Sequence, residues 1–287
     1  MSNKKKVFIY LIIVFVTLLN SRCFNDVSES SNIDSLSYSK ELIQSKKYSE
    51  ALNELNKIKI DLPELLKLKG VCYFNLNDFR NSLVYFTEYT KMNVNDKDSY
   101  LFIGQCKEKL NAPDEAIKDY DKVISLDEKN SFAYYRKGKI AQLKDSFNLA
   151  IKYYLTAMKF DSIDYKIYNE AGLAFEAIGN HTISIKYYNK AIILNPNDGG
   201  IFFNRGVALL YNEKYKEAID DFNQAIHSEK NPLFFLNRGI AYYYNKELDK
   251  ACLDWEFALK GGQNDAIEYL EKYCKEKAKT NNKTTDI

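Results

Sequence analysis

The chain has 287 residues, of which 46% are hydrophobic, and its formal net charge is +2. Four of its cations and no acid lie in residues 1–22, so the remainder carries a small negative charge, which argues against binding to a nucleic-acid backbone. Its two histidines are isolated, and none of its five cysteines forms a Cys-x-x-Cys pair. The sequence therefore predicts neither a metal site nor a cofactor.

Residues 1–22 have the composition of a targeting segment. Three consecutive lysines, Lys4 to Lys6, precede a largely apolar run from Val7 to Leu19. This run is short for a bilayer span but matches the hydrophobic core of a secretory signal peptide. We therefore expect export, to the periplasm or the outer membrane if the protein is bacterial. An uncleaved membrane anchor and an apolar tail without a targeting role are the alternatives.

Cys23 follows this segment directly and resembles the lipidated cysteine of bacterial lipoproteins. Such sites usually have a small residue before the cysteine, whereas this chain has Arg22, so ordinary cleavage is the alternative to a lipid anchor on the membrane. Residues 23–31 are largely polar and show no periodicity. We expect them to form a flexible tether between the membrane and the folded part.

From residue 32 onward, a small residue recurs with nearly constant spacing. The series begins at Ser39 and continues with six glycines, at successive spacings of 31, 34, 34, 34, 34 and 33 residues. Each period contains two short amphipathic segments, which is typical of a helical solenoid. The glycines are Gly70, Gly104, Gly138, Gly172, Gly206 and Gly239. The predicted repeats are residues 32–62, 63–96, 97–130, 131–164, 165–198, 199–231 and 232–265.

The residues within one period are similar to those of the tetratricopeptide repeat (TPR). The repeat at 165–198 has the small, aromatic and proline residues of that family at Gly172, Phe175, Ser184, Tyr188, Ala191 and Pro196. The resemblance implies an all-α fold, a superhelical solenoid of about seven helix–turn–helix repeats over residues 32–265. One helical pair cannot bury its own apolar face, so neighbouring repeats must stack into a continuous core.

The end of the chain predicts a capping helix over residues 266–277. Ala266, Leu270 and Cys274 recur at every fourth position, so they lie on one helix face that can cover the last repeat. In an oxidising compartment Cys274 can form a disulfide with Cys252 of the last repeat, and a pair of buried thiols is the alternative. Residues 278–287 are polar and predict a disordered tail.

No group of side chains predicts catalysis. The glycines recur singly at the repeat period, which does not make a phosphate-binding loop. Four aspartates lie on predicted second helices beside aromatic residues, and we expect them on a solvated helix face rather than in an acid–base pair. They are Asp119, Asp220, Asp221 and Asp254. We therefore expect a binding protein and not an enzyme.

TPR arrays typically bind peptides in a concave groove lined by the first helix of each repeat. By this resemblance, the groove candidates are Tyr135, Arg136, Lys139, Asn169, Glu170, Glu176, Phe203, Asn204, Leu210, Tyr211, Asn237, Tyr243 and Tyr244. Asn204 and Asn237 occupy equivalent positions, and an amide offers both a donor and an acceptor to a peptide backbone. The tyrosines offer amphipathic contact area. For Phe203, with the aliphatic residues Val207, Leu236 and Ile240, a role in the core is the alternative.

Some TPR proteins hold the C-terminal carboxylates of chaperones with a lysine and an asparagine on the first helix. At these positions the fifth repeat has Asn169 and Leu173, and the sixth has Phe203 and Val207. A partner with an acidic tail is therefore disfavoured in this half of the array.

The sequence as a whole predicts a non-catalytic scaffold that binds a protein or peptide in its groove. Apolar side chains of the partner are expected to bury Phe203, Leu210, Tyr211, Tyr243 and Tyr244. The charges of Arg136, Lys139, Glu170 and Glu176 are expected to set register and association rate more than affinity. The alternatives are a self-associating structural subunit of an envelope assembly and an accessory subunit of an enzyme.

Overall fold

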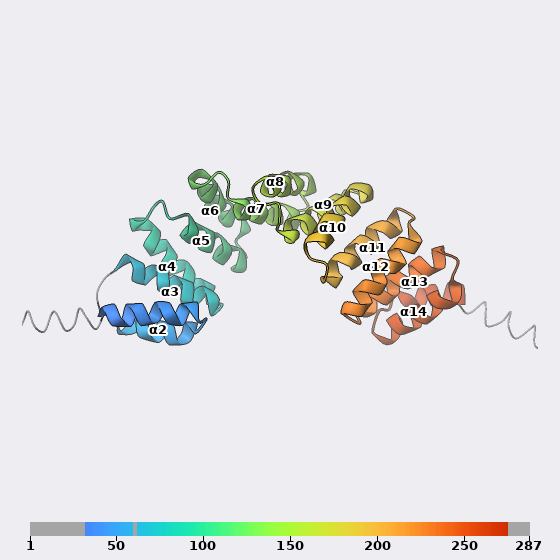
Figure 1. The fold of residues 1–287 in the computed structure, drawn as a ribbon, viewed down its shortest axis with the longest axis horizontal. Helices are drawn as coiled ribbons and strands as arrows, with labels where there is room; N and C mark the ends of the chain where they lie inside the picture. The colour runs from blue at the N-terminus through green and yellow to red at the C-terminus, as the bar shows by residue number, and fades with distance from the viewer. Residues whose placement is uncertain (1–31, 60–61, 275–287) are drawn as a thin grey trace, which may run out of the picture. The chain divides into compact units, whose positions relative to one another are not determined.

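The computed structural model describes residues 32–59 and 62–274, and every regular element in these ranges is helical (Figure 1). The chain divides into two compact units, with the boundary between Glu128 and Lys129, and each unit is described by itself. The first unit begins with a helix over residues 32–44. It continues with α2 (Tyr48–Lys57), α3 (Pro63–Asn75), α4 (Phe79–Met92), α5 (Lys97–Lys109) and α6 (Pro113–Leu126).

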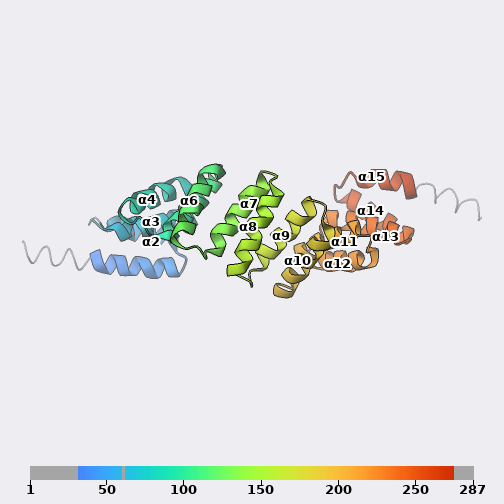
Figure 2. The same ribbon diagram turned by 90° about the horizontal axis from the view of Figure 1, so that it is seen from above.

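The second unit contains four helical pairs and a short closing segment. The pairs are α7 (Ser131–Leu143) with α8 (Phe147–Phe160), α9 (Tyr165–Ala177) with α10 (His181–Leu194), α11 (Gly199–Tyr211) with α12 (Tyr215–Ser228), and α13 (Pro232–Tyr244) with α14 (Leu248–Lys260). Figure 2 shows the closing segment, labelled α15, beside α14. We call the two members of each pair its first and second helices.

In six of the helical pairs of the two units, from α3 with α4 to α13 with α14, a glycine of the first helix packs against an aromatic ring of the second. A Cβ atom added to Gly172 would lie 2.5 Å from the ring of Tyr188, closer than real Cβ contacts, so the ring needs the glycine. The equivalent contacts are Gly70–Phe86, Gly104–Tyr120, Gly138–Tyr154, Gly206–Phe222 and Gly239–Trp255. All these rings are fully buried, so the repeat period follows from one packing contact made six times.

The turn inside each pair contains one residue with positive φ. Gly179 has φ 75°, but the same place holds Glu213 at 59° and Lys246 at 65°. Such a backbone costs a residue with a Cβ about 1–2 kcal/mol. Backbone hydrogen bonds across the turn offset that cost: the N–H of Lys214 donates to the carbonyl of Leu209 at 2.9 Å. These bonds end the first helix and reverse the chain direction.

Two aspartates on second helices are buried, so the expectation of a solvated face is wrong for them. Arg238 donates to both carboxylate oxygens of Asp254 at 2.7 Å, and Arg205 donates to both oxygens of Asp221 at 2.7 and 2.6 Å. The aspartate side chains are 8% and 6% exposed. A bidentate arginine makes this burial tolerable because it satisfies both oxygens of each carboxylate. Of the other two aspartates, Asp119 pairs with Lys107 and Asp220 is exposed.

The segment after the last repeat is helical from Ala266 to Cys274, the part of the predicted capping helix that the structure describes. Helix α15 covers Ala266–Tyr269, and the chain continues as a π-helical turn, η1 (Leu270–Cys274); residues 275–277 lie outside the described ranges. Cys274 forms a disulfide with Cys252, in place of the alternative thiol pair. Tyr269 stacks on Trp255 with ring centroids 4.9 Å apart, and Ala266 is buried in the same cluster. The segment therefore covers the apolar end of the last repeat.

Several predictions concern residues outside the described ranges. These are the signal peptide at 1–22, lipidation at Cys23, the tether that follows it and the tail at 278–287. They remain predictions. Among the residues that the structure does describe, no helix combines the length and the apolar character that a membrane crossing requires.

Candidate partner-binding surface

The predicted groove residues all lie on the first helices of the second unit. Neighbouring first helices contact one another: α7 with α9, α9 with α11, and α11 with α13. The same helices follow one another along this unit in both ribbon views (Figures 1 and 2). We call the outward side of α7, α9, α11 and α13, with the predicted residues on it, the first-helix surface.

Polar side chains connect the first helices across this surface. Lys139 of α7 forms an ion pair with Glu170 of α9 at 2.5 Å, and Gln142 donates to the other oxygen of Glu170 at 3.3 Å. Asn204 of α11 donates through Nδ2 to Oδ1 of Asn169 at 3.1 Å. Two of the four predicted groove charges therefore neutralise each other. The asparagine pair keeps a donor on Asn169 and an acceptor on Asn204 for a peptide backbone.

The remaining predicted polar residues behave differently from one another. Arg136 lies over the ring of Phe132, with the guanidinium carbon 5.9 Å from the ring centroid. Asn237 donates to the backbone carbonyl of Leu233, one turn earlier in its own helix, at 2.9 Å. Asn204 and Asn237 therefore share a position in the repeat but not a hydrogen-bonding role, because only Asn204 faces another amide on the preceding first helix.

Part of the predicted apolar set belongs to the core. Phe203 is half-buried and stacks on Phe234 with centroids 4.6 Å apart, and Leu236 is buried. Leu210 is half-buried against the core cluster around Phe222. Tyr135 is likewise half-buried, against the cluster around Tyr154. These residues can offer a partner only a fraction of their surface.

Two tyrosines, by contrast, are largely exposed and have fixed orientations. Tyr211 is 67% exposed and stacks on His181, with centroids 4.8 Å apart and an interplanar angle of 10°. Tyr244 is 54% exposed and stacks on Tyr215 at 5.3 Å and 15°. In both pairs, the end of a first helix meets the start of the preceding second helix. Tyr243 instead turns toward the cap, 4.3 Å from the ring of Tyr273.

Sequence reasoning missed the two supporting rings, His181 and Tyr215. They are 34 residues apart, one full repeat, and each opens a second helix. An aromatic ring at this place in consecutive repeats was the signal that could have found them. The role of this ring depends on how far the next first helix extends, because that helix carries the tyrosine that stacks on the ring.

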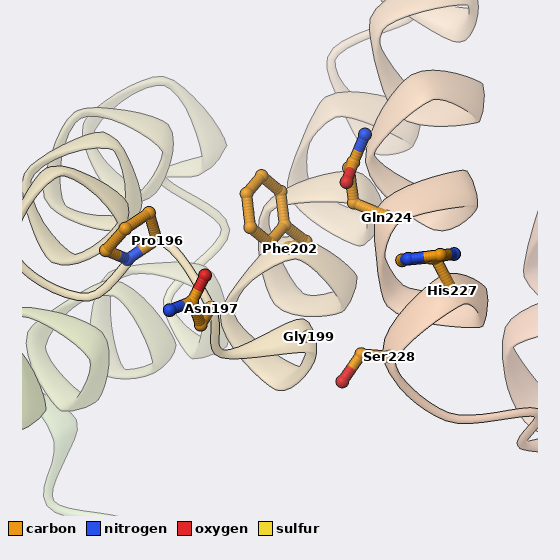
Figure 3. Close-up of a pocket in the computed structure, with 7 residues that line it drawn as sticks. All are labelled: Pro196, Asn197, Gly199, Phe202, Gln224, His227 and Ser228. Carbon is orange, nitrogen blue, oxygen red and sulfur yellow. The ribbon is translucent and has the colours of Figure 1, made fainter.

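One pocket of about 470 Å³ lies on the first-helix surface. We call it the Glu176 pocket, and it is lined by Leu173, Glu176, Ala177, Gly179, His181 and Tyr211. Another pocket, of about 330 Å³, lies between the start of α11 and the end of α12 (Figure 3). Its lining is Pro196, Asn197, Gly199, Phe202, Gln224, His227 and Ser228, which includes no carboxylate, lysine or arginine. Of these two pockets, the Glu176 pocket is the one that contains predicted groove residues.

Burial raises the pKa of the Glu176 carboxyl, and the hydrogen bond that it accepts from the hydroxyl of Tyr188, at 2.9 Å, only partly opposes this. The unfolded carboxyl ionises first as the pH rises above about 4, so ionisation lowers the free energy of unfolding between there and neutral pH. The variant Glu176→Gln has no carboxyl group here, so its free energy of unfolding does not fall for this reason. In thermal melts, we expect the variant to gain stability over the native chain as the pH rises from about 4 to about 7. A gap that stays constant or reverses would contradict the assignment.

Comparison with known proteins decides the family. Residues 97–130, 133–164 and 165–198 match one model of the tetratricopeptide repeat, and residues 187–220 match another. The chain contains tetratricopeptide repeats. A curated relative, Hsp70–Hsp90 organizing protein 3 of Arabidopsis thaliana, is 30% identical to it over 114 residues. The matched part is 40% of this chain and 20% of the relative, so this TPR chain spans about a fifth of that protein.

Solved TPR structures share the fold. The peptide-binding TPR protein YrrB superposes with a TM-score of 0.60 at 22% identity, covering 65% of this chain and 97% of YrrB. The C-terminal part of a TPR protein from Cytophaga hutchinsonii gives 0.67 at 21% identity, covering 81% and 98%. PilF of Pseudomonas aeruginosa gives 0.63 at 15% identity, covering 73% and 97%. The predicted all-α TPR solenoid is thus confirmed.

Proposed function

We propose that this TPR protein is a non-catalytic scaffold that binds a segment of a partner protein on the first-helix surface of its second unit. The observation that carries the proposal is the exposure of Tyr211 and Tyr244. Both rings are oriented by stacking before a partner arrives, so binding costs little side-chain entropy. Rigid, exposed aromatic rings are typical anchors of protein interfaces.

The amides beside these rings support a peptide as the occupant. Asn169 and Asn204 lie on adjacent first helices and each keeps hydrogen-bonding capacity. A peptide that crosses α9 and α11 can bond its backbone to this pair and place a side chain against Tyr211. YrrB, a protein of the same fold, has a peptide-binding site of its own, which shows that this architecture can hold such a ligand.

The test compares the full chain with two double variants. Tyr211→Ala with Tyr244→Ala removes the exposed rings of the first-helix surface. Leu253→Ala with Phe257→Ala removes side chains on α14 that are 66% and 42% exposed. Peptides selected from a displayed random library on the native chain should bind the first variant at least about thirtyfold more weakly, the effect of losing an anchor of about 2 kcal/mol. They should bind the second variant unchanged.

As a control, circular dichroism should show that all three proteins are equally helical. Equal peptide affinity for the two double variants would place the interface away from the first-helix surface. Failure to select any peptide on the native chain, together with a mass that grows with concentration, would favour the self-associating subunit over the scaffold.

We also infer that the protein is exported and tethered to a membrane by Cys23. The support is the lysine-rich and apolar character of residues 1–22 and a disulfide between Cys252 and Cys274, a bond that persists in oxidising compartments. If Cys23 carries the lipid, Cys23→Ala should move the protein from the membrane fraction to the soluble fraction. Unchanged fractionation would contradict the lipid tether.

A further inference from the structure

The Glu176 pocket contains a carboxylate without a countercharge. Glu176 lies at the end of α9, lines the pocket and accepts one hydrogen bond, from the hydroxyl of Tyr188. Within residues 32–59 and 62–274, no lysine or arginine lies within ion-pair distance of it. Hydrogen bonding to a neutral hydroxyl compensates a buried charge only in part.

Three other carboxylates of the same unit that are partly or fully buried do have a cation. Glu170 faces Lys139, Asp221 faces Arg205, and Asp254 faces Arg238. Glu176 therefore departs from a pattern that its own neighbours follow. Among these four acids, it is also the one that lines the pocket of about 470 Å³.

The walls of the pocket suit a long cationic side chain. Tyr211 is largely exposed, and His181 covers one face of its ring, which leaves the other face to a ligand. An aromatic face attracts an ammonium or guanidinium group. Leu173 and Ala177 line the same pocket and offer apolar contact to a methylene chain. Charge and shape together select a cation on an apolar stem.

We propose that the Glu176 pocket binds a lysine or arginine side chain of the partner polypeptide, with the cation on the carboxylate of Glu176 and the stem against Tyr211. This inference rests on the proposed function, because it specifies which side chain of the partner the first-helix surface recognises. It also predicts a preference against acidic segments, since a carboxylate of the partner would be repelled at this place.

The test uses a substitution for which the chain itself provides a precedent. Glu176→Gln keeps an acceptor for Tyr188, and Gln142 already accepts from Tyr154 at 3.0 Å at the equivalent place two helices earlier. The variant should therefore fold. Glu256→Gln, the same change at an exposed position on α14, is the matched control. Glu176→Lys reverses the charge of the pocket.

Displayed random peptides are selected separately on the native chain and on each variant. We expect the native chain and Glu256→Gln to enrich lysine or arginine at one fixed position of the selected peptides. Replacing that residue by glutamine should weaken binding to the native chain about tenfold or more, the usual value of a charge-assisted hydrogen bond. The same replacement should have no effect on Glu176→Gln, and Glu176→Lys should enrich aspartate or glutamate there.

The outcomes separate this inference from the proposed function. Peptides that depend on Tyr211 and Tyr244 but show no cationic position would overturn the inference and leave the scaffold intact. A cationic position that persists in Glu176→Lys would also overturn it. Loss of all peptide selection on the native chain would instead contradict the proposed function.

Discussion

Arg238→Ala is expected to lower the free energy of unfolding by about 3–5 kcal/mol, the usual cost of leaving one partner of a buried ion pair alone. Asp254 is 8% exposed and would lose both of its hydrogen bonds from Arg238. The Oδ1 atom of Asn223, on the preceding repeat, would lose its donor as well. Trp255, the only tryptophan of the chain, adjoins Asp254, so its fluorescence during urea unfolding reports this region.

Two further variants test whether this loss of stability comes from the unpaired buried charge. Lys250→Ala breaks an exposed ion pair with Glu247 and is expected to have a much smaller effect, because solvent screens exposed pairs. Arg238→Met combined with Asp254→Leu removes both charges and should recover most of the stability, because no buried charge is left unpaired. If Arg238→Ala costs no more than Lys250→Ala, the ion pair between Arg238 and Asp254 does not stabilise the last repeat.

Trp255→Ala is expected to cost about 3–5 kcal/mol, the range for emptying a buried aromatic site. The indole is fully buried, packs against Gly239 and stacks on Tyr269 of the cap. Its loss removes the surface on which α15 lies. Repeats unfold partly independently, so the effect should be concentrated at this end of the chain. Hydrogen exchange measured by mass spectrometry should rise in α13, α14 and α15 and remain near native values in α9 and α10.

Trp255→Phe is the matched control. The equivalent ring is a phenylalanine in two other repeats, Phe86 and Phe222, so the site accepts one. The indole Nε1 has no hydrogen-bond acceptor within the described residues, so phenylalanine forfeits no polar contact there. The cost should therefore be well below that of Trp255→Ala. Equal losses for the two variants would mean that the ring does not anchor the cap.

Much of the fold could be predicted because each repeat is stabilised by contacts at fixed spacing. Glycine and its aromatic partner are 16 residues apart in six repeats, as in Gly206–Phe222. The same spacing contained a further signal. Arg205 precedes the glycine and Asp221 precedes the ring, so the two must meet wherever Gly206 and Phe222 pack. The expectation that Asp221 lies in solvent overlooked this signal.

The groove could be predicted only as a set of positions. Lys139 and Glu170 are 31 residues apart, and Asn169 and Asn204 are 35 apart, so neither pair follows the repeat period. Whether such residues face a partner or one another depends on the rotation between stacked repeats, which the spacing does not specify. In the structure Lys139 and Glu170 pair with each other, so neither is an unpaired charge on the first-helix surface.

The sequence by itself determined the helical pairs, the length of each repeat and the ring that packs on each of the six repeat glycines. These features depend on contacts within one repeat. Tertiary structure decided which side chains remain available. Tyr243 and Tyr244 are adjacent at the end of one first helix, yet Tyr244 is exposed and Tyr243 packs against the cap. Glu170 and Glu176 are both acids of α9, yet only Glu170 meets a lysine among the described residues. For these four residues, exposure and charge compensation depend on contacts with the neighbouring repeat or the cap, which the sequence of a single repeat does not specify.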